Sequence, residues 1–239
     1  MRLTILVLIV CCLVLNVVAG NVTPNPCRAE VFVPDSLKQK PSTPSPDGQF
    51  RAILRDYREG RDSEEGALRL FHGERLLGRY VLHDLSAGIF VKWSPDSRAF
   101  YIMWSNGGMV GGYDVRVFRV SPNKAREVFP TKLAEREFRR GHDCRTRGIN
   151  IFAIQWIDGS ERLKIAAQVY PASDCGKEMG FTMGYTVRLN DGAVLERYPQ
   201  EAIEKEMKEC PALVWPTAMW DDNALQQAKA KIGQAASRP

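Results

Sequence analysis

The sequence predicts a mostly β fold, made of repeated antiparallel four-stranded sheets with short helices near the C-terminus. Short runs of β-branched and aromatic residues, separated by turn residues, follow one another from residue 49 to about residue 198. A proline–aspartate turn sequence recurs within the same stretch. Hydrophobic residues make up 44% of the chain and charged residues 26%, which is typical of a globular protein. A β-sandwich with duplicated hairpins is the alternative fold.

The first twenty residues differ in character from the rest of the chain. Arg2 supplies a positive charge, residues 3–18 are nearly all apolar, and the small residues Ala19 and Gly20 follow. We therefore predict a signal peptide over residues 1–20, cleaved after Ala19 or Gly20. The mature protein would be secreted or periplasmic, without an integral membrane span. A retained membrane anchor is the alternative, although the apolar run is short for a span of about 20 residues.

Four of the six cysteines remain after this cleavage, and an even number in an exported protein predicts disulfide bonds. Three pairings are possible. We favour Cys144–Cys175, which flank one β segment, and Cys27–Cys210, which would join the first ordered residues to the C-terminal part. Free buried thiols are the alternative. The chain has no C-x-x-C motif and only three His, so we predict no metal site.

The predicted domain organisation follows the composition along the mature chain. Residues 21–45 are rich in Pro and Ser and predict an extended arm. A β domain follows over residues 46–198, and residues 199–239 form a C-terminal helical extension. Helices are expected at Thr131–Arg140 and Pro199–Glu209. The expected strands are Phe50–Tyr57, Ala67–Phe71, Leu76–Leu82, Ile89–Trp93, Ala99–Trp104, Tyr113–Val120, Arg126–Phe129, Ile149–Ile157, Arg162–Tyr170, Phe181–Leu189 and Val194–Tyr198.

The most informative feature is an internal repeat. The turn sequence Ser45-Pro46-Asp47-Gly48 recurs as Ser94-Pro95-Asp96-Ser97, and each copy leads into an apolar run. A degenerate third copy begins at Trp156 and continues as Ile157-Asp158-Gly159-Ser160. Trp93 and Trp156 end the strands that precede the second and third copies. Proline fixes φ at the first turn position, aspartate accepts backbone N–H bonds, and glycine or serine completes the reversal.

This pattern resembles the W-S-P-D-G hairpin of TolB-type β-propeller blades, over about residues 45–198. The resemblance implies three blade-like sheets, with each aromatic residue packed between neighbouring blades. Copies lie 49 residues apart (45 to 94) and 63 apart (93 to 156), and periods of about 40–50 suit four-stranded blades. Closed propellers have about 4–8 blades. We therefore expect a partial or atypical propeller, with the C-terminal helix and Cys27–Cys210 protecting its exposed edges.

A glycine-rich segment between two expected strands is the first candidate binding site. Residues 104–114 contain four Gly within six residues, flanked by Trp104 and Tyr113. Backbone amides there can bind a ligand, and the aromatic rings can stack on a sugar or a peptide. Candidate ligand-binding residues are Trp104, Asn106, Met109 and Tyr113. A loop at 175–181 has a similar composition, and a long hairpin without a ligand is the alternative.

A basic stretch is the second candidate. Arg139, Arg140 and Arg147 lie in a segment of six Lys and Arg over residues 132–147, diluted by Glu135 and Glu137. The chain has 33 Lys and Arg against 28 Asp and Glu, and loss of Arg2 leaves a mature net charge of +4. Such a surface suits an anionic partner, although a solvated helix face is the ordinary interpretation. Stacking aromatics do not surround the stretch, so nucleic acid is not expected.

Catalysis has little support in the sequence. The chain contains no G-x-S-x-G, H-E-x-x-H, Walker or dinucleotide-binding motif, so we predict no catalytic residue and no cofactor. The expected function is a non-catalytic extracytoplasmic binding module that contacts a protein or an anionic envelope component through inter-strand loops. One alternative is a small secreted hydrolase with an acid/base pair from His142, Asp143 or Asp174. Another is a structural subunit that assembles through open sheet edges.

Overall fold

A computed structural model describes residues 35–37, 40–59, 64–83, 85, 89–105, 112–141, 148–170 and 175–209. The predicted signal peptide lies outside these residues, as do Cys27, Cys144, Cys210 and everything after residue 209. The described residues belong to one compact unit.

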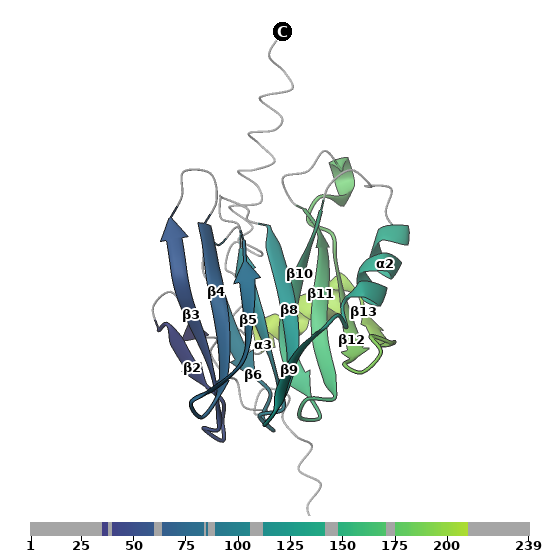
Figure 1. Cartoon of the computed structure of the whole chain (residues 1–239). Coiled ribbons are helices and arrows are strands. Elements are labelled where there is room, and N and C mark those ends of the chain that lie inside the picture. Colours follow the sequence, from purple (N-terminus) through teal and green to yellow (C-terminus); the bar gives the residue numbers. More distant parts are fainter. Residues whose placement is uncertain are drawn as a thin grey trace, which may run out of the picture. The chain divides into compact units, whose positions relative to one another are not determined.

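The fold consists of three antiparallel sheets, each built around four consecutive strands, and β1 is added to the edge of the second (Figure 1). The first sheet has the order β2-β3-β4-β5, the second β1-β6-β7-β8-β9, and the third β10-β11-β12-β13. The strands are β1 (Asp35–Ser36), β2 (Ser42–Pro44), β3 (Phe50–Glu59), β4 (Glu64–His72), β5 (Arg75–Leu82), β6 (Ile89–Trp93), β7 (Ala99–Ser105), β8 (Tyr113–Ser121), β9 (Lys124–Val128), β10 (Ile149–Ile157), β11 (Arg162–Val169), β12 (Thr182–Arg188) and β13 (Val194–Tyr198). The helices are α2 (Lys132–Arg140), the short 3₁₀ helix η1 (Gly176–Glu178) and α3 (Gln200–Glu209).

These elements confirm the predicted fold class. Each expected strand coincides with an observed strand to within a few residues, and α2 and α3 coincide with the two expected helices. The segments β1 and β2 fall in the stretch for which the sequence predicts an extended arm. They are extended, and each pairs with the edge of a sheet: β1 with β6, and β2 with β3. An edge strand tolerates Pro44, because its outer side makes no ladder hydrogen bonds.

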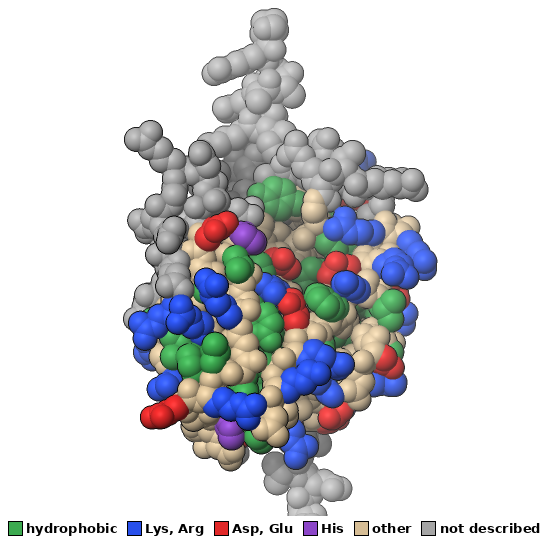
Figure 2. Space-filling model, viewed as in Figure 1, with side chains coloured by type: hydrophobic (Ala, Val, Ile, Leu, Met, Phe, Trp, Pro, Cys, Tyr) green, Lys and Arg blue, Asp and Glu red, His purple; other side chains and the backbone are tan. Residues whose placement is uncertain are grey.

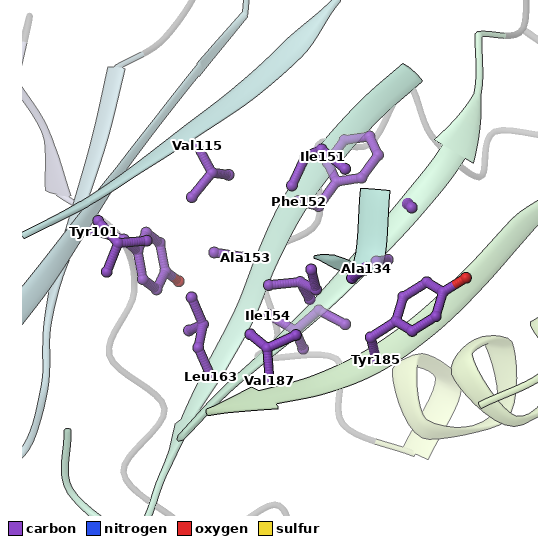
Figure 3. Close-up of a cluster of buried hydrophobic side chains, with 14 of the residues drawn as sticks. Tyr101, Val115, Ala134, Ile151, Phe152, Ala153, Ile154, Leu163, Tyr185 and Val187 are labelled. Atoms are coloured by element: carbon purple, nitrogen blue, oxygen red, sulfur yellow. The ribbon is translucent and has the colours of Figure 1, made fainter. Parts of the chain in front are cut away.

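The second sheet is buried on both faces, because it packs between the other two sheets. Side chains of β7 alternate between two cores: Phe100 and Ile102 belong to the core shared with the first sheet. Tyr101 and Met103 belong to the core shared with the third sheet, part of which Figure 3 shows. All seven residues of β7 are buried. A two-sheet sandwich would bury only one face of each sheet, so the stack of three sheets matches the repeated-blade prediction.

Helix α3 covers the outer face of the third sheet. Ile203 of α3 is 1% exposed and packs directly on Gly184 of β12, where any side chain would collide with it. Lys164 of β11 forms an ion pair with Glu206 of α3, and its ammonium lies 4.1 Å from the centre of the Tyr198 ring. The helix therefore closes one end of the stack.

The repeated turn sequence forms the same hairpin in the first two sheets. Ser45 donates a hydrogen bond of 2.6 Å to Asp47, and Ser94 donates one of 2.7 Å to Asp96. Each serine Oγ also accepts a bond of 3.0 Å from the backbone N–H five residues later, at Phe50 and Ala99. The three copies join β2 to β3, β6 to β7 and β10 to β11, so each connects two consecutive, neighbouring strands of its sheet.

Two tryptophans join each sheet to the one before it in the sequence. The indole N–H of Trp93 donates to the backbone oxygen of Thr43 in the first sheet, at 3.3 Å. The indole N–H of Trp156 donates to the backbone oxygen of Lys92 in the second sheet, at 3.2 Å. Thr43 and Lys92 both lie two residues before the serine of their turn. The two contacts are therefore structurally equivalent.

The turns themselves are also joined across the sheets. The backbone N–H of Asp47 donates to Ser97 Oγ at 3.1 Å, and Ser160 Oγ donates to Asp96 Oδ2 at 2.8 Å. Burial alone would raise the pKa of Asp96, but hydrogen bonds from Ser94, Ser160 and the backbone hold it below its ordinary value. The third copy lacks the Ser-Pro pair, and it meets the second copy at Gly159. A Cβ on Gly159 would lie 2.9 Å from Asp96 Oδ2.

We expect Trp93→Phe and Trp156→Phe to lower the free energy of unfolding by similar amounts. Each removes one buried cross-sheet hydrogen bond, which should cost about 1 kcal/mol in addition to the cost of replacing a large ring by a smaller one. Trp104→Phe is the control, since the Trp104 indole makes no hydrogen bond within the described residues. Urea denaturation measures all three. Equal losses for Trp104→Phe and the other two would contradict the role of the indole N–H groups.

Lys92 gives a pH-dependent prediction. Its side chain is 7% exposed, and burial lowers its pKa to about 8. Between about pH 8 and its ordinary pKa of 10.5, the unfolded chain holds this proton and the native chain does not, so the free energy of unfolding rises with pH. We expect Lys92→Met to stabilise the protein at pH 7 by about 3 kcal/mol. The gain should vanish near pH 10.5. Lys124→Met, at an exposed site, should give no such gain in the same denaturation series.

Candidate ligand-binding pocket

A pocket of about 570 Å³ opens where segments from all three sheets and α2 meet. It lies at the ends of β5, β7, β8 and β10, opposite the ends that carry the repeated turns. Its lining residues are Val81, His83, Trp104, Gly112, Tyr113, Asp114, Arg116, Glu135, Arg139, Ile149 and Ile151. Figure 2 shows this face, with acidic side chains near its centre and basic side chains around them.

Three of the predicted ligand-binding residues come together in this pocket. Trp104 is the second-last residue of β7, Tyr113 begins β8, and Arg139 lies in the last turn of α2. Arg140 is exposed on α2 and does not line the pocket. Asn106, Met109 and Arg147 lie outside the described residues, as do the hydrolase candidates His142, Asp143 and Asp174.

Tyr113 forms an ordered wall of the pocket. Its ring lies 4.8 Å from the ring of Phe152, and its backbone N–H donates to Asn150 Oδ1 at 2.9 Å. Burial raises the pKa of the Tyr113 hydroxyl, against the effect of a hydrogen bond with Ser105. Trp104 is 8% exposed, so it presents only part of its ring to the pocket. The aromatic surface is thus fixed before any ligand arrives.

Arg116 is held in place at the base of the pocket. Its guanidinium makes two hydrogen bonds to the Glu127 carboxylate, at 2.7 and 2.5 Å, and a third at 2.7 Å to the backbone oxygen of Val81. It also lies 5.9 Å from the centre of the Tyr80 ring. The charge of Arg116 is therefore balanced by Glu127, and its contacts join β8 to β5.

Two carboxylates inside the pocket were not among the predicted residues. Asp114 is exposed to the solvent of the pocket, but the protein atoms around it raise its pKa by desolvation. The charges of Glu135 and Glu127 raise the pKa further, and the charge of Arg116 lowers it. A hydrogen bond of 2.7 Å from the Val115 N–H also lowers it. Glu135 accepts a bond of 2.6 Å from the hydroxyl of Thr131, which orients its carboxylate.

The sequence offered only a weak signal for these acids. Asp114 ends the glycine-rich segment. Glu135 is part of the basic stretch, where the sequence indicated only that it lowers the net positive charge. The structure separates the charges of α2: Glu137 pairs with Arg197 of β13, while Glu135 and Arg139 line the pocket. The pocket therefore offers both acceptors and a donor, within a chain of net positive charge.

Cys175 is disulfide-bonded, and every other cysteine lies outside the described residues. The pairs Cys144–Cys175 and Cys27–Cys210 therefore remain predictions. The loop that contains Cys175 follows β11, whose last residue Val169 pairs with Ile149, the first residue of β10. This pairing places the loop at the pocket end of the third sheet.

Among the described residues, no group of three or more His, Cys, Asp and Glu side chains is placed to hold a metal ion. None of the helices in the described part of the chain has both the length and the apolar character needed to cross a membrane.

No protein-family model, curated protein or solved structure matches this chain. The interpretation of the pocket therefore depends on its own geometry and charges.

Asp114 gives a prediction that depends on the sign of its pKa shift. Because the pKa of Asp114 is higher in the native protein than in the unfolded chain, binding of its proton stabilises the native state. This stabilisation is complete below pH 3.8, the ordinary pKa of aspartate, and is lost as the pH rises through the native pKa. Asparagine does not titrate. We expect the stability of Asp114→Asn relative to the wild type to increase with pH between about pH 3 and pH 7. Thermal denaturation across this range tests it, and a pH-independent difference would contradict the shift.

Proposed function

We propose that this chain is a non-catalytic extracytoplasmic binding module that holds part of a protein or envelope component in the pocket of β5, β7, β8, β10 and α2. The observation that carries this proposal is the convergence of Trp104, Tyr113 and Arg139 with Asp114 and Glu135 around one cavity of about 570 Å³. Ligand pockets typically combine an apolar wall with a few fixed polar groups. Here the apolar wall includes Ile149 and Ile151.

The charges suggest what such a ligand would carry. Asp114 and Glu135 accept hydrogen bonds from hydroxyl or amine groups, and Arg139 donates to a carboxylate or phosphate. The charge of Arg116 is already balanced by Glu127. A ligand that combines donors with an acidic group, such as an amino sugar derivative or a peptide terminus, fits this set better than a simple anion.

Export and family kinship belong to the same proposal. The predicted signal peptide supports export, and the repeated hairpin with cross-sheet tryptophans supports kinship with TolB-type propeller blades as an open, three-sheet relative. Repeat architectures commonly place binding loops at one end of rigid sheets. The pocket lies at the end opposite the turns, which agrees with that arrangement.

The experiment is a calorimetric titration of the mature protein with defined amino sugars, oligosaccharides and short peptides. The double variant Glu135→Gln/Arg139→Gln removes one charge of each sign from the pocket. Glu74→Gln/Arg126→Gln makes the same change at exposed sites outside it. We expect the control to bind like the wild type and the pocket variant to lose roughly a hundredfold in affinity, because two charge-assisted hydrogen bonds disappear.

Three results would contradict the proposal. Absence of binding by any compound would leave the pocket without a ligand of the proposed kind, and unchanged affinity in the pocket variant would place the site elsewhere. Recovery of a bound compound in hydrolysed form would favour the secreted-hydrolase alternative.

A further inference from the structure

The outer face of the first sheet carries a regular grid of side chains. The strand register aligns Arg55 with Ala67 and Val81 in one row, and Ile53 with Arg69 and Arg79 in the next. The third row is Arg51, Phe71 and Leu76. Residues that pair across antiparallel strands point to the same side of the sheet. We call these nine residues the arginine face; they alternate in sequence with the buried residues Ala52, Leu54, Leu68 and Leu70 of the core.

The arginine face has four positive charges and no negative one. Of the described acidic side chains on these strands, Glu65 lies beyond the grid, where it pairs with His83 at 2.8 Å. Arg51 and Arg55 are exposed, and neither forms an ion pair within the described residues. Arg69 and Arg79 stand directly opposite each other on β4 and β5.

Apolar side chains separate the arginines. Ile53 and Ala67 belong to this face but are only 8% and 2% exposed. Arg51 lies 5.9 Å from the centre of the Phe71 ring. Leu76 and Val81 are 50% and 45% exposed. Figure 2 shows basic and hydrophobic side chains together over β3, β4 and β5. The face is therefore basic and partly apolar at once.

The two ends of the stack differ in this respect. Helix α3 covers the outer face of the third sheet, whereas in the first sheet Arg51, Arg55, Arg79, Leu76 and Val81 remain exposed. A second copy of this chain is a poor occupant, because it would bring the exposed Arg51 and Arg55 of both copies together. Charge complementarity calls for an anionic surface.

We propose that the arginine face docks on a membrane surface that contains anionic phospholipids. Guanidinium groups bind phosphate through two parallel hydrogen bonds, which a grid of arginines repeats over an area. Leu76 would enter the boundary between headgroups and acyl chains, while Val81 also lines the pocket and lies where the two surfaces meet. An anionic membrane offers both the charge and the apolar layer, whereas an acidic peptide matches only the charge. This inference does not depend on the ligand of the pocket.

The test is flotation of the mature protein with vesicles of phosphatidylcholine alone, or of phosphatidylcholine mixed with phosphatidylglycerol. We expect binding to the mixed vesicles only, and weaker binding at high salt. Arg51→Gln/Arg55→Gln should lose roughly thirtyfold in vesicle affinity, since each basic residue near the surface contributes about one factor of five. Arg98→Gln/Arg126→Gln changes the net charge equally at exposed sites outside the arginine face and should bind like the wild type.

Circular dichroism and thermal denaturation of the two double variants verify that both fold. Three outcomes would overturn the proposal. These are failure of the wild type to float with the mixed vesicles, equal loss of binding in both double variants, and unchanged binding in both. A fourth arm uses poly-glutamate: capture of this peptide without vesicle binding, abolished in Arg51→Gln/Arg55→Gln, would assign the face to an acidic protein instead.

Discussion

The stack of sheets depends on one repeated interaction, the hydrogen bonding that joins each proline–aspartate turn and its tryptophan to the preceding sheet. The indole of Trp156 bonds to the backbone beside the second turn, and Ser160 bonds to the carboxylate of that turn at Asp96. Trp93 and Ser97 make the corresponding contacts one sheet earlier. Apolar packing between sheets is not directional, so these polar contacts are what fix the relative position of neighbouring sheets.

The joined turns and the pocket therefore lie at opposite ends of the strands. The turns are joined at one end, while at the other end the strand termini leave room for the pocket beside α2. Trp104 and Tyr113 reach the pocket from adjacent strands of the middle sheet, which is buried on both faces and is therefore rigid. A site on such strands is positioned before its ligand binds.

The sequence predicted the strands and the repeat well, because alternation and turn chemistry are local signals. It named Trp104, Tyr113 and Arg139 as candidate ligand-binding residues, and the fold brings these three together around one pocket. Asp114 and Glu135 were missed because a single carboxylate among basic or glycine-rich neighbours has no distinctive pattern. The arginine face could not be predicted without the register of the strands. A bulge between Leu70 and Phe71 sets which residues of β5 face outward, and no local sequence pattern gives that pairing.

The most direct test of the account is a double-mutant cycle between Asp96 and Ser160, measured by urea denaturation of Asp96→Ala, Ser160→Ala and the double variant. The two residues lie 64 positions apart and belong to different sheets. If the turns hold the sheets together, the cycle should give a favourable coupling energy of about 1 kcal/mol. A coupling energy indistinguishable from zero would contradict the account, because the bond between the second and third turns would then contribute nothing to holding their sheets together.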